Sequence, residues 1–247
     1  MPRPAPVGSI SASADQPAPA RRGPPYAAVV DLTTSYEAVI PADVRARFEM
    51  REVRNAAAIL AATNPSAFAE IVGVLTDFRL EAMDITEPGG GKSRLAIRVD
   101  ETFRRLGWRE GQHDTHVTSV LSLQPYHPAD EREARVVEKQ VLNIGYKVDN
   151  VKDRVALDVE WNAKDGNLDR DVGAYRALYD GGIIDAGVII TRTFVSIRDL
   201  AVTLGRPGAF GTTTTTTIDK LVPRMTRGDG GGCPILAIGI TERAYAP

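Results

Sequence analysis

The sequence contains a single cysteine, Cys233, among its 247 residues. One thiol cannot form an internal disulfide, so the chain is not a disulfide-stabilised scaffold and fits a reducing compartment. Cys233 opens an apolar run that ends at Ile240, so we interpret it as a small buried hydrophobe rather than a nucleophile. No run approaches the roughly 18 apolar residues of a membrane span, and no apolar segment near the start indicates a secretory signal. We therefore expect a cytoplasmic protein with no membrane partner.

Histidine is also scarce. His113 and His116, with Asp114 between them, suggest a zinc site in a predicted loop. A zinc site needs third and fourth ligands at a recognisable spacing, and the remaining histidine, His127, does not supply them. We interpret all three histidines as surface residues.

The glycine-rich segment 86–93 lacks a complete phosphate-binding signature. A P-loop requires glycine where Thr86 stands, and it follows a buried strand rather than a helix. We expect a turn instead, with Ser93 capping the next helix.

Neither sign of charge dominates the chain. The formal net charge is −2, and the hydrophobic share of 43% is that of an ordinary soluble protein. Residues 128–185 contain 13 acids against 9 Lys and Arg, whereas residues 191–247 contain 7 Lys and Arg against 4 acids. An acidic centre beside a basic segment suits a metal site that also binds a phosphate backbone.

The segment 1–25 contains seven prolines and few large apolar residues. Such a segment cannot bury enough surface to offset the entropy of ordering, so we expect a disordered tail. We expect residues 26–247 to form a single domain. Periodicity predicts strands at 26–32 and 117–123, and helices at 41–62, 66–80, 93–106 and 130–139.

The central stretch 155–162 alternates apolar residues with polar ones, which predicts a strand with one packed and one polar face. Asp158 and Glu160 then project from the same face, roughly 6.6 Å apart. The turn at 150–153 brings Asp149 alongside them. Adjacent carboxylates beside a core are costly unless a cation offsets their charge, and hard divalent cations prefer carboxylate oxygens. The plain alternative is three surface acids on an edge strand.

The residues after this strand predict its neighbour. Apolar positions recur at helical spacing from Leu168 to Asp180, Gly181 and Gly182 end the helix, and residues 187–190 form a buried strand. A strand, a crossover helix and a second strand predict parallel neighbours. The fold class is therefore α/β, with a mixed β-sheet core flanked by helices.

The pattern Asp149-x8-Asp158-x-Glu160, followed by this helix and strand, resembles the active-site signature of the PD-(D/E)xK nuclease superfamily. The sequence VDNVKDRVALDVEWNAKDGNLDRDVGAYRALYDGGIIDAGVIITR resembles the BamHI/BglII-like type II restriction endonucleases more closely. Glu160 stands where the superfamily generally has lysine, and this branch replaces that lysine with Glu or Gln. The resemblance covers about residues 140–192, and more weakly the segment to 241.

The resemblance implies a restriction-endonuclease-like fold and Mg²⁺-dependent, sequence-specific cleavage of double-stranded DNA. Asp149, Asp158 and the backbone carbonyl of Val159 would ligate one or two Mg²⁺ ions. Glu160 would hold or deprotonate the attacking water, or share a second metal. Lys164 and Asn162 are candidates for contact with the phosphate.

The resemblance implies a catalytic core at about 95–192 and a DNA-recognition segment at about 193–241. In the latter segment, hydroxyl and cationic side chains can reach phosphates and base edges. The candidates are Thr214, Thr215, Lys220, Arg224 and Arg227. The plain alternative is a polar strand or loop with a solvated basic helix. The resemblance also implies a homodimer on palindromic DNA and a cognate DNA methyltransferase encoded nearby. Three alternatives stay open: a structure-specific repair or junction nuclease, a non-catalytic DNA-binding module, and a two-carboxylate sugar hydrolase.

Overall fold

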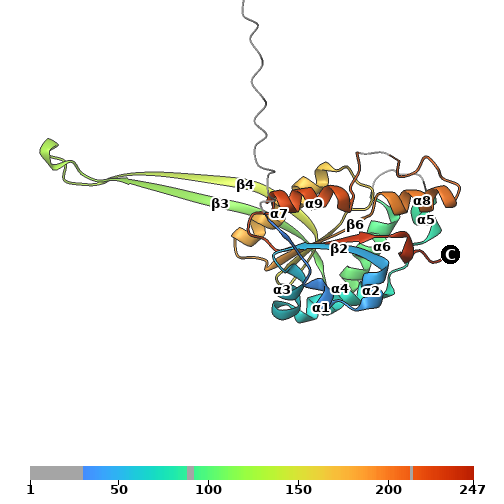
Figure 1. Cartoon of the computed structure of the whole chain (residues 1–247). Coiled ribbons are helices and arrows are strands. Elements are labelled where there is room, and N and C mark those ends of the chain that lie inside the picture. The colour runs from blue at the N-terminus through green and yellow to red at the C-terminus, as the bar shows by residue number, and fades with distance from the viewer. Residues whose placement is uncertain (1–29, 88–91, 212–213) are drawn as a thin grey trace, which may run out of the picture.

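A computed structural model describes residues 30–87, 92–211 and 214–247 (Figure 1). The predicted tail at 1–25, most of the predicted strand at 26–32, the glycines of the segment 88–91, and the pair Thr212–Thr213 lie outside these described residues.

A seven-stranded sheet forms the centre of the described chain, in the order β1-β2-β7-β6-β5-β4-β3. β5, β6 and β7 run parallel to one another, and the remaining neighbours are antiparallel. The sheet is therefore mixed, as the sequence predicts. Its strands are β1 (Leu32–Thr33), β2 (Phe48–Val53), β3 (Arg109–Leu123), β4 (Arg135–Lys152), β5 (Val155–Val159), β6 (Ala186–Arg192) and β7 (Ile235–Ile240).

Helices cover both faces of the sheet (Figure 1). One face packs against α7 (Gly166–Asp180) and α9 (Ile218–Arg227). The other face packs mainly against α2 (Ala42–Arg47), α3 (Ala56–Thr63), α4 (Pro65–Asp77) and α6 (Arg94–Arg105). The remaining helices are the short α1 (Tyr36–Val39), α5 (Ala82–Thr86) and α8 (Val195–Thr203). None of the described helices is long and apolar enough to cross a membrane.

The predicted unit of strand, crossover helix and parallel strand is confirmed. β5 pairs with β6 in parallel, with Leu157 opposite Val188, and α7 connects them. Gly182 follows α7 at φ +69°, a backbone conformation that costs glycine nothing because it has no Cβ.

β5 is an interior strand, and all five of its residues are buried. The predicted polar face with Asp158 and Glu160 is present, but it is buried rather than open to solvent. Helices cover both faces of a parallel sheet, so even the acidic side of β5 lies against α7. The alternative of surface acids on an edge strand is excluded, because β4 and β6 flank β5.

The predicted helix at 41–62 was wrong in its middle. The chain forms α2, then β2, then α3. β2 pairs with β7 along its length, from Phe48 opposite Ile240 to Val53 opposite Ile235. Arg54 and Asn55 both adopt positive φ, which ends the strand and starts α3 in a new direction. Tertiary pairing overrode the helical propensity of the alanine-rich run.

The predicted loop at His113–His116 and the predicted helix at 130–139 were also wrong. Both segments belong to a long antiparallel hairpin of β3 and β4, with a turn at His127–Ala129. Helical propensity favoured the charged residues at 130–139, but Val136 and Val137 enter β4 and pair across to Ser122 and Leu121. The hairpin extends far from the rest of the molecule (Figure 1).

The other predicted helices differ little from those observed. α6 starts as predicted, because the Ser93 hydroxyl accepts a hydrogen bond from the amide of Ala96. α4 starts at Pro65, one residue before the predicted cap Ser66, with Asn64 in the cap position. Both helices bury apolar residues at the predicted spacing.

Candidate active site

The three predicted acids lie together where β4 and β5 pair. Asn150 is opposite Leu157 in the register, so Asp149 and Asp158 are the next pair along. The amide of Asp149 donates a hydrogen bond of 2.8 Å to Oδ1 of Asp158. Glu160 follows β5 directly, and its amide donates to the carbonyl of Ile190 on the neighbouring strand. The sheet itself therefore brings these acids together.

Asp158 is the most constrained of the three. Its side chain is buried, and its Oδ2 accepts a 2.8 Å hydrogen bond from the hydroxyl of Tyr175 on α7. The Tyr175 hydroxyl also lies 2.7 Å from the carbonyl of Val188. Burial raises the pKa of Asp158 to about 7, and the charges of Asp149 and Glu160 act in the same direction.

Glu160 is buried beside the start of α7. Its carboxylate accepts hydrogen bonds from Asn167 Nδ2, and Arg170 Nη2 lies 3.6 Å from its Oε1. Burial raises the pKa of Glu160 in spite of these partners. The hydroxyls of Thr191 and Thr216 both donate to the Glu160 carbonyl, at 2.9 Å each, which fixes its backbone.

A fourth acid, Asp171, faces this pair from α7. It is fully buried, and its Oδ1 accepts hydrogen bonds from the guanidinium of Arg170. Burial raises its pKa to about 9, and the charges of Asp158 and Glu160 add to the effect. Three carboxyl groups within one buried cluster cannot all ionise cheaply, so the metal-free cluster retains protons at neutral pH.

A fifth acid, Asp100 of α6, approaches Asp149 through Lys92. Asp100 is fully buried, and its Oδ1 accepts a 2.7 Å hydrogen bond from Nδ2 of Asn150. Nζ of Lys92 lies 2.6 Å from Asp100 Oδ2 and 3.0 Å from Asp149 Oδ2. Burial opposes the charge of Lys92, but the two carboxylates outweigh it and raise its pKa. A cation therefore already lies between two of the acids.

These donors fit a hard divalent cation, because they are carboxylate oxygens in a place where a cation stabilises them. The side chains are not arranged as a ready metal centre: among the described residues, no three His, Cys, Asp or Glu side chains form a metal-binding group. In the metal-free chain the carboxylate of Asp149 instead pairs with Lys92. The backbone of Val159 lines the same cavity.

A cavity of about 330 Å³ opens over these acids. Asp149, Glu160, Lys92 and Arg170 contribute charged groups to its lining. A neighbouring cavity of about 580 Å³ shares Lys92, Ser93, Trp161 and Asn162 with it. The two together form a polar hollow at the carboxyl end of β5, where ligands commonly bind in open α/β sheets.

Sequence patterns did not identify Asp171 or Lys92 as site residues. For Asp100 and Glu101, both in the predicted helix at 93–106, they indicated only that one of the two could approach the metal site. Their signals were present in the helical spacing. Asp171 lies four residues before Tyr175 on the buried side of α7, and Asp100 lies three residues before Phe103 in α6. An acid in the apolar stripe of a helix is costly unless it has a partner, so each was a candidate on those grounds.

The predicted DNA-binding residues divide into two groups. Lys164, Thr214 and Thr215 lie beside the site, since Lys164 pairs with Thr215 in an isolated bridge and Thr214 accepts a hydrogen bond from the amide of Asp165. Thr215 Oγ1 and Asn162 Oδ1 both accept from the guanidinium of Arg192.

The second group is cationic and already paired with acids. Arg224 makes two hydrogen bonds to Asp169, Lys220 lies 3.2 Å from Asp165, and Arg227 pairs with Asp229. Burial is slight at Arg227 and partial at the other two. These side chains come from α9, which packs beside α7.

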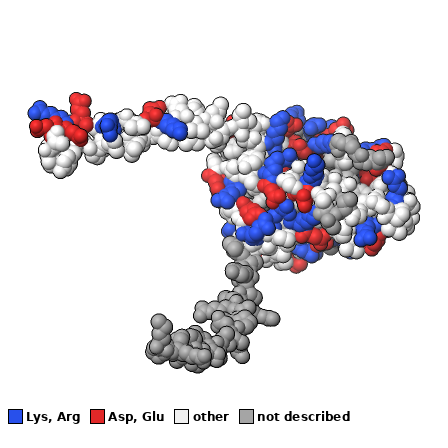
Figure 2. All heavy atoms as spheres, turned by 90° about the horizontal axis from the view of Figure 1, so that it is seen from above, with Lys and Arg blue, Asp and Glu red and all other residues white. Residues whose placement is uncertain are grey.

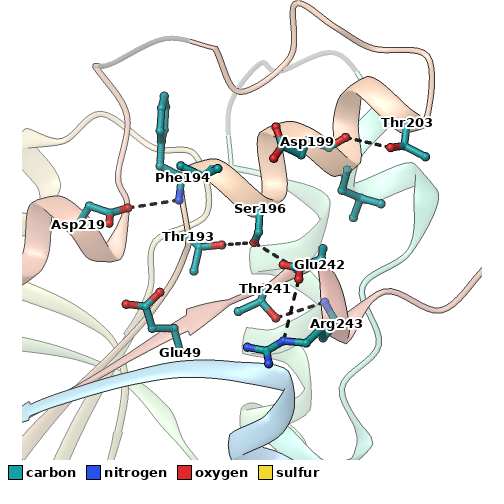
Figure 3. Close-up of a pocket in the computed structure, with 12 residues that line it drawn as sticks. Glu49, Thr193, Phe194, Ser196, Asp199, Thr203, Asp219, Thr241, Glu242 and Arg243 are labelled. Carbon is teal, nitrogen blue, oxygen red and sulfur yellow. Dashed lines mark hydrogen bonds and ion pairs between the residues drawn. The ribbon is translucent and has the colours of Figure 1, made fainter.

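A larger pocket of about 600 Å³ lies apart from the acids (Figure 3). Thr193 and Ser196 lie on its floor with their hydroxyls 2.6 Å apart. Its lining carries four carboxylates and one arginine, namely Glu49, Asp199, Asp219, Glu242 and Arg243. An acidic lining repels a phosphate backbone, so size alone does not make this pocket the site.

Two comparisons bear on what this arrangement does. The sequence model of a family described as "Restriction endonuclease BglII/BglIII" matches residues 48–240. The match includes both strands of the acidic site, α7, and the segment of Thr214 and Thr215. A search of curated proteins finds no significant match to the chain.

Proposed function

Because the chain belongs to the BglII/BglIII restriction endonuclease family, we propose that the acids beneath its polar hollow are the catalytic centre that hydrolyses DNA. The family is one of type II site-specific deoxyribonucleases, so the chain is an enzyme and its substrate is DNA. The observation that carries the proposal is the convergence of Asp149, Asp158 and Glu160 at the β4–β5 pair. Membership of this family excludes the two alternatives of a sugar hydrolase and a non-catalytic DNA-binding module.

Enzymes of this family generally depend on a divalent metal, and we assign Mg²⁺ to this chain. Asp149, Asp158, Glu160 and the carbonyl of Val159 would hold one or two ions. Asp100 joins them as a candidate, since its Oδ2 already lies 2.6 Å from the ammonium of Lys92. Bound Mg²⁺ supplies Lewis acidity at the scissile phosphate and lowers the pKa of water there.

The side chains of the protein perform the remaining work. Glu160 takes the proton of the attacking water, a role that suits a carboxyl whose pKa is raised by burial. Asn167 and Arg170 hold its carboxylate in place. Lys92 keeps Asp100 and Asp149 together until another cation takes them, after which its ammonium can contact a phosphate oxygen.

DNA contacts follow from the surroundings of the site. Lys164, Thr214 and Thr215 line its edge and would contact the backbone next to the cut. Lys220, Arg224 and Arg227 would contact phosphates by exchanging their acidic partners for DNA; these partners are Asp165, Asp169 and Asp229. We also propose a homodimer, since a two-fold symmetric site mirrors two-fold protein symmetry, and a cognate methyltransferase gene nearby.

Cleavage of unmethylated plasmid DNA in Mg²⁺ tests the catalytic assignment. We expect discrete fragments from the wild type and a loss of at least about a hundredfold in rate for Glu160→Ala and for Asp149→Ala, because each removes a carboxylate from the reacting centre. Asp153→Asn is the matched control, because it alters an exposed acid in the turn between the same two strands. Wild-type rates in either alanine variant would contradict the assignment.

Thermal unfolding at two pH values tests the metal. The pKa of Asp158 is raised to about 7 and that of Asp171 to about 9. A carboxyl whose pKa is raised on folding contributes its full stability below its pKa in the unfolded chain, near 4. That contribution is lost as pH rises from about 4 through the folded-state pKa values of about 7 and 9. The metal-free protein should therefore lose stability over this window.

Mg²⁺ should reverse this loss. Binding requires ionised carboxylates, so Mg²⁺ should raise Tm more at pH 8 than at pH 5.5. At pH 8, a hundredfold excess over Kd should add about 2–3 kcal/mol to the free energy of unfolding. Differential scanning calorimetry with and without EDTA measures both effects. Equal shifts at the two pH values, or an unchanged shift in Asp149→Ala, would rule out a metal held by this cluster.

A further inference from the structure

The hairpin of β3 and β4 has an outer part that we call the arm, consisting of residues 112–147, with its tip at the turn between the two strands. β3 alone has 15 residues, which span about 50 Å at the usual rise of a strand. A folded domain of this size has a radius of gyration of only about 16 Å. The arm therefore extends beyond the body to which it is attached (Figures 1 and 2), and the rest of the described chain leaves its outer surface uncovered.

The arm carries most of the exposed apolar surface of the described chain. Eleven of the 18 large exposed hydrophobic side chains lie between Val117 and Tyr146. Figure 2 shows the arm as mostly uncharged, with charges gathered at its tip, whereas the body is densely charged. A two-stranded hairpin is at best marginally stable in water, and exposed apolar patches of this kind mark interaction surfaces.

The strand register sorts these side chains onto two faces. Val120 opposite Glu138, Ser122 opposite Val136 and His116 opposite Leu142 share the first arm face, with Ile144 two residues beyond Leu142. The second arm face holds Val117 opposite Val141 and Leu121 opposite Val137, together with Lys139 and Arg135.

The two faces differ in exposure and charge. Val120, Val136, Leu142 and Ile144 are 58–83% exposed, whereas the five large apolar residues of the second face, Leu123 included, are 37–57% exposed. In the segments 116–123 and 135–144, Glu138 is the only Asp, Glu, Lys or Arg on the first face. The first face therefore leaves its apolar side chains more open to solvent and carries fewer charges.

The charge of the arm argues against DNA as its occupant. Residues 112–147 contain four Lys and Arg against five acids, so the arm offers no positive excess to a phosphate backbone. An apolar face with one carboxylate instead fits another protein surface of the same kind. The same surface is present on every copy of the chain, and two-fold dimers bury such a patch against itself.

We propose that two copies of this chain associate through their arms, with the first arm face of one copy packed on the first arm face of the other. One premise rests on the proposed function, namely that cutting both strands of DNA needs two catalytic centres. The structural link is β4, which runs without interruption from the arm to Asp149. Packing of the arms would hold the inner end of β4, and with it Asp149, at a fixed position relative to the second copy.

Two matched double variants of the full chain test this assignment. Val120→Thr with Leu142→Ser makes the first face polar, and Val141→Thr with Leu121→Ser makes the same chemical change on the second face. Sedimentation equilibrium without DNA should show that the wild type is a dimer. The first pair of substitutions should raise the dimer Kd at least about tenfold, and the second pair should change that Kd by less than about threefold. Both variants should keep the wild-type Tm, since the arm lies outside the core.

Several results would overturn the proposal. A monomeric wild type at micromolar concentrations would do so, and so would equal weakening by both double variants. Loss of DNA affinity from the first pair with dimerisation unchanged would make the arm a DNA contact instead. Sedimentation measures dimerisation independently of cleavage, so a chain inactivated by Asp158→Asn should dimerise like the wild type. An error in the catalytic assignment can therefore be distinguished from an error in the proposed arm interface.

Discussion

Replacing Asp158 with asparagine is expected to abolish DNA cleavage and, at the same time, to stabilise the metal-free protein. The carboxylate lies at the centre of the proposed metal site, so its loss should lower kcat by at least about a thousandfold, equivalent to several kcal/mol of lost transition-state stabilisation. The fold should tolerate the change. Asparagine Oδ1 can still accept the amide of Asp149, and its Nδ2 can donate to Tyr175, whose hydroxyl then donates to Val188.

The gain in stability follows from the raised pKa of Asp158, about 7 in the folded chain. Below pH 4 the carboxyl is protonated in both states, and the variant should match the wild type. Between pH 4 and pH 7 the unfolded carboxyl ionises while the buried one stays protonated, so the wild type loses stability as pH rises. The variant should therefore be the more stable by about 1–3 kcal/mol at pH 8.

Urea unfolding in EDTA at pH 5 and pH 8 measures this difference. As a control, Asp153→Asn removes an exposed carboxylate from the turn between β4 and β5, and it should change neither the cleavage rate nor the free energy of unfolding. A variant that is less stable than the wild type at pH 8 would show that Asp158 holds the fold together rather than straining it.

Gly187→Ala is expected to have the largest effect on folding. Gly187 is in β6, and a Cβ at this position would lie 2.1 Å from Cδ2 of the Tyr175 ring, closer than any side chain tolerates. Tyr175 is fully buried between β6 and Asp158 and cannot move away without losing its hydrogen bonds. We expect a loss of more than about 3 kcal/mol in the free energy of unfolding.

Gly173→Ala provides the matched comparison on α7. The added Cβ would have no contact nearer than 3.6 Å, from the hydroxyl of Tyr146. Alanine in a helix is favoured over glycine by about 1 kcal/mol, so this variant should be slightly more stable than the wild type. If Gly187→Ala unfolds at the same urea concentration as Gly173→Ala, the close packing of Tyr175 on β6 is incorrect.

The predictable part of this protein is the part whose signals are local. Alternation around Asp158, the helical spacing from Leu168 and the glycine pair after Asp180 together predict β5, α7 and β6 in their observed order. Asp149 could be added because the hairpin turn to β5 is short. The family match then agrees with the resemblance drawn from these same residues.

The remaining features depend on contacts that no local pattern contains. β2 forms because β7, nearly 190 residues later, offers a partner for Phe48 and its neighbours. Asp100 and Lys92 belong to the site only because α6 packs beside β4, which places Asn150 within 2.7 Å of Asp100. The arm was missed because the charged residues at its tip favour a helix, whereas cross-strand pairing decides the structure.

The register of β4 has a consequence for how this chain can vary. β4 pairs with β5 only through Asn150–Lys152. The residues of β4 from Arg135 to Val148 pair with β3 alone. Matched insertions or deletions, two residues in each strand of the arm, would change its reach and leave Asp149 facing Asp158. Deletion of Asn150, with Val151 and Lys152 still paired to β5, would turn Asp149 to the opposite face of the sheet. Arm length is thus a variable that engineering can adjust in steps of two, independently of the chemistry at its base.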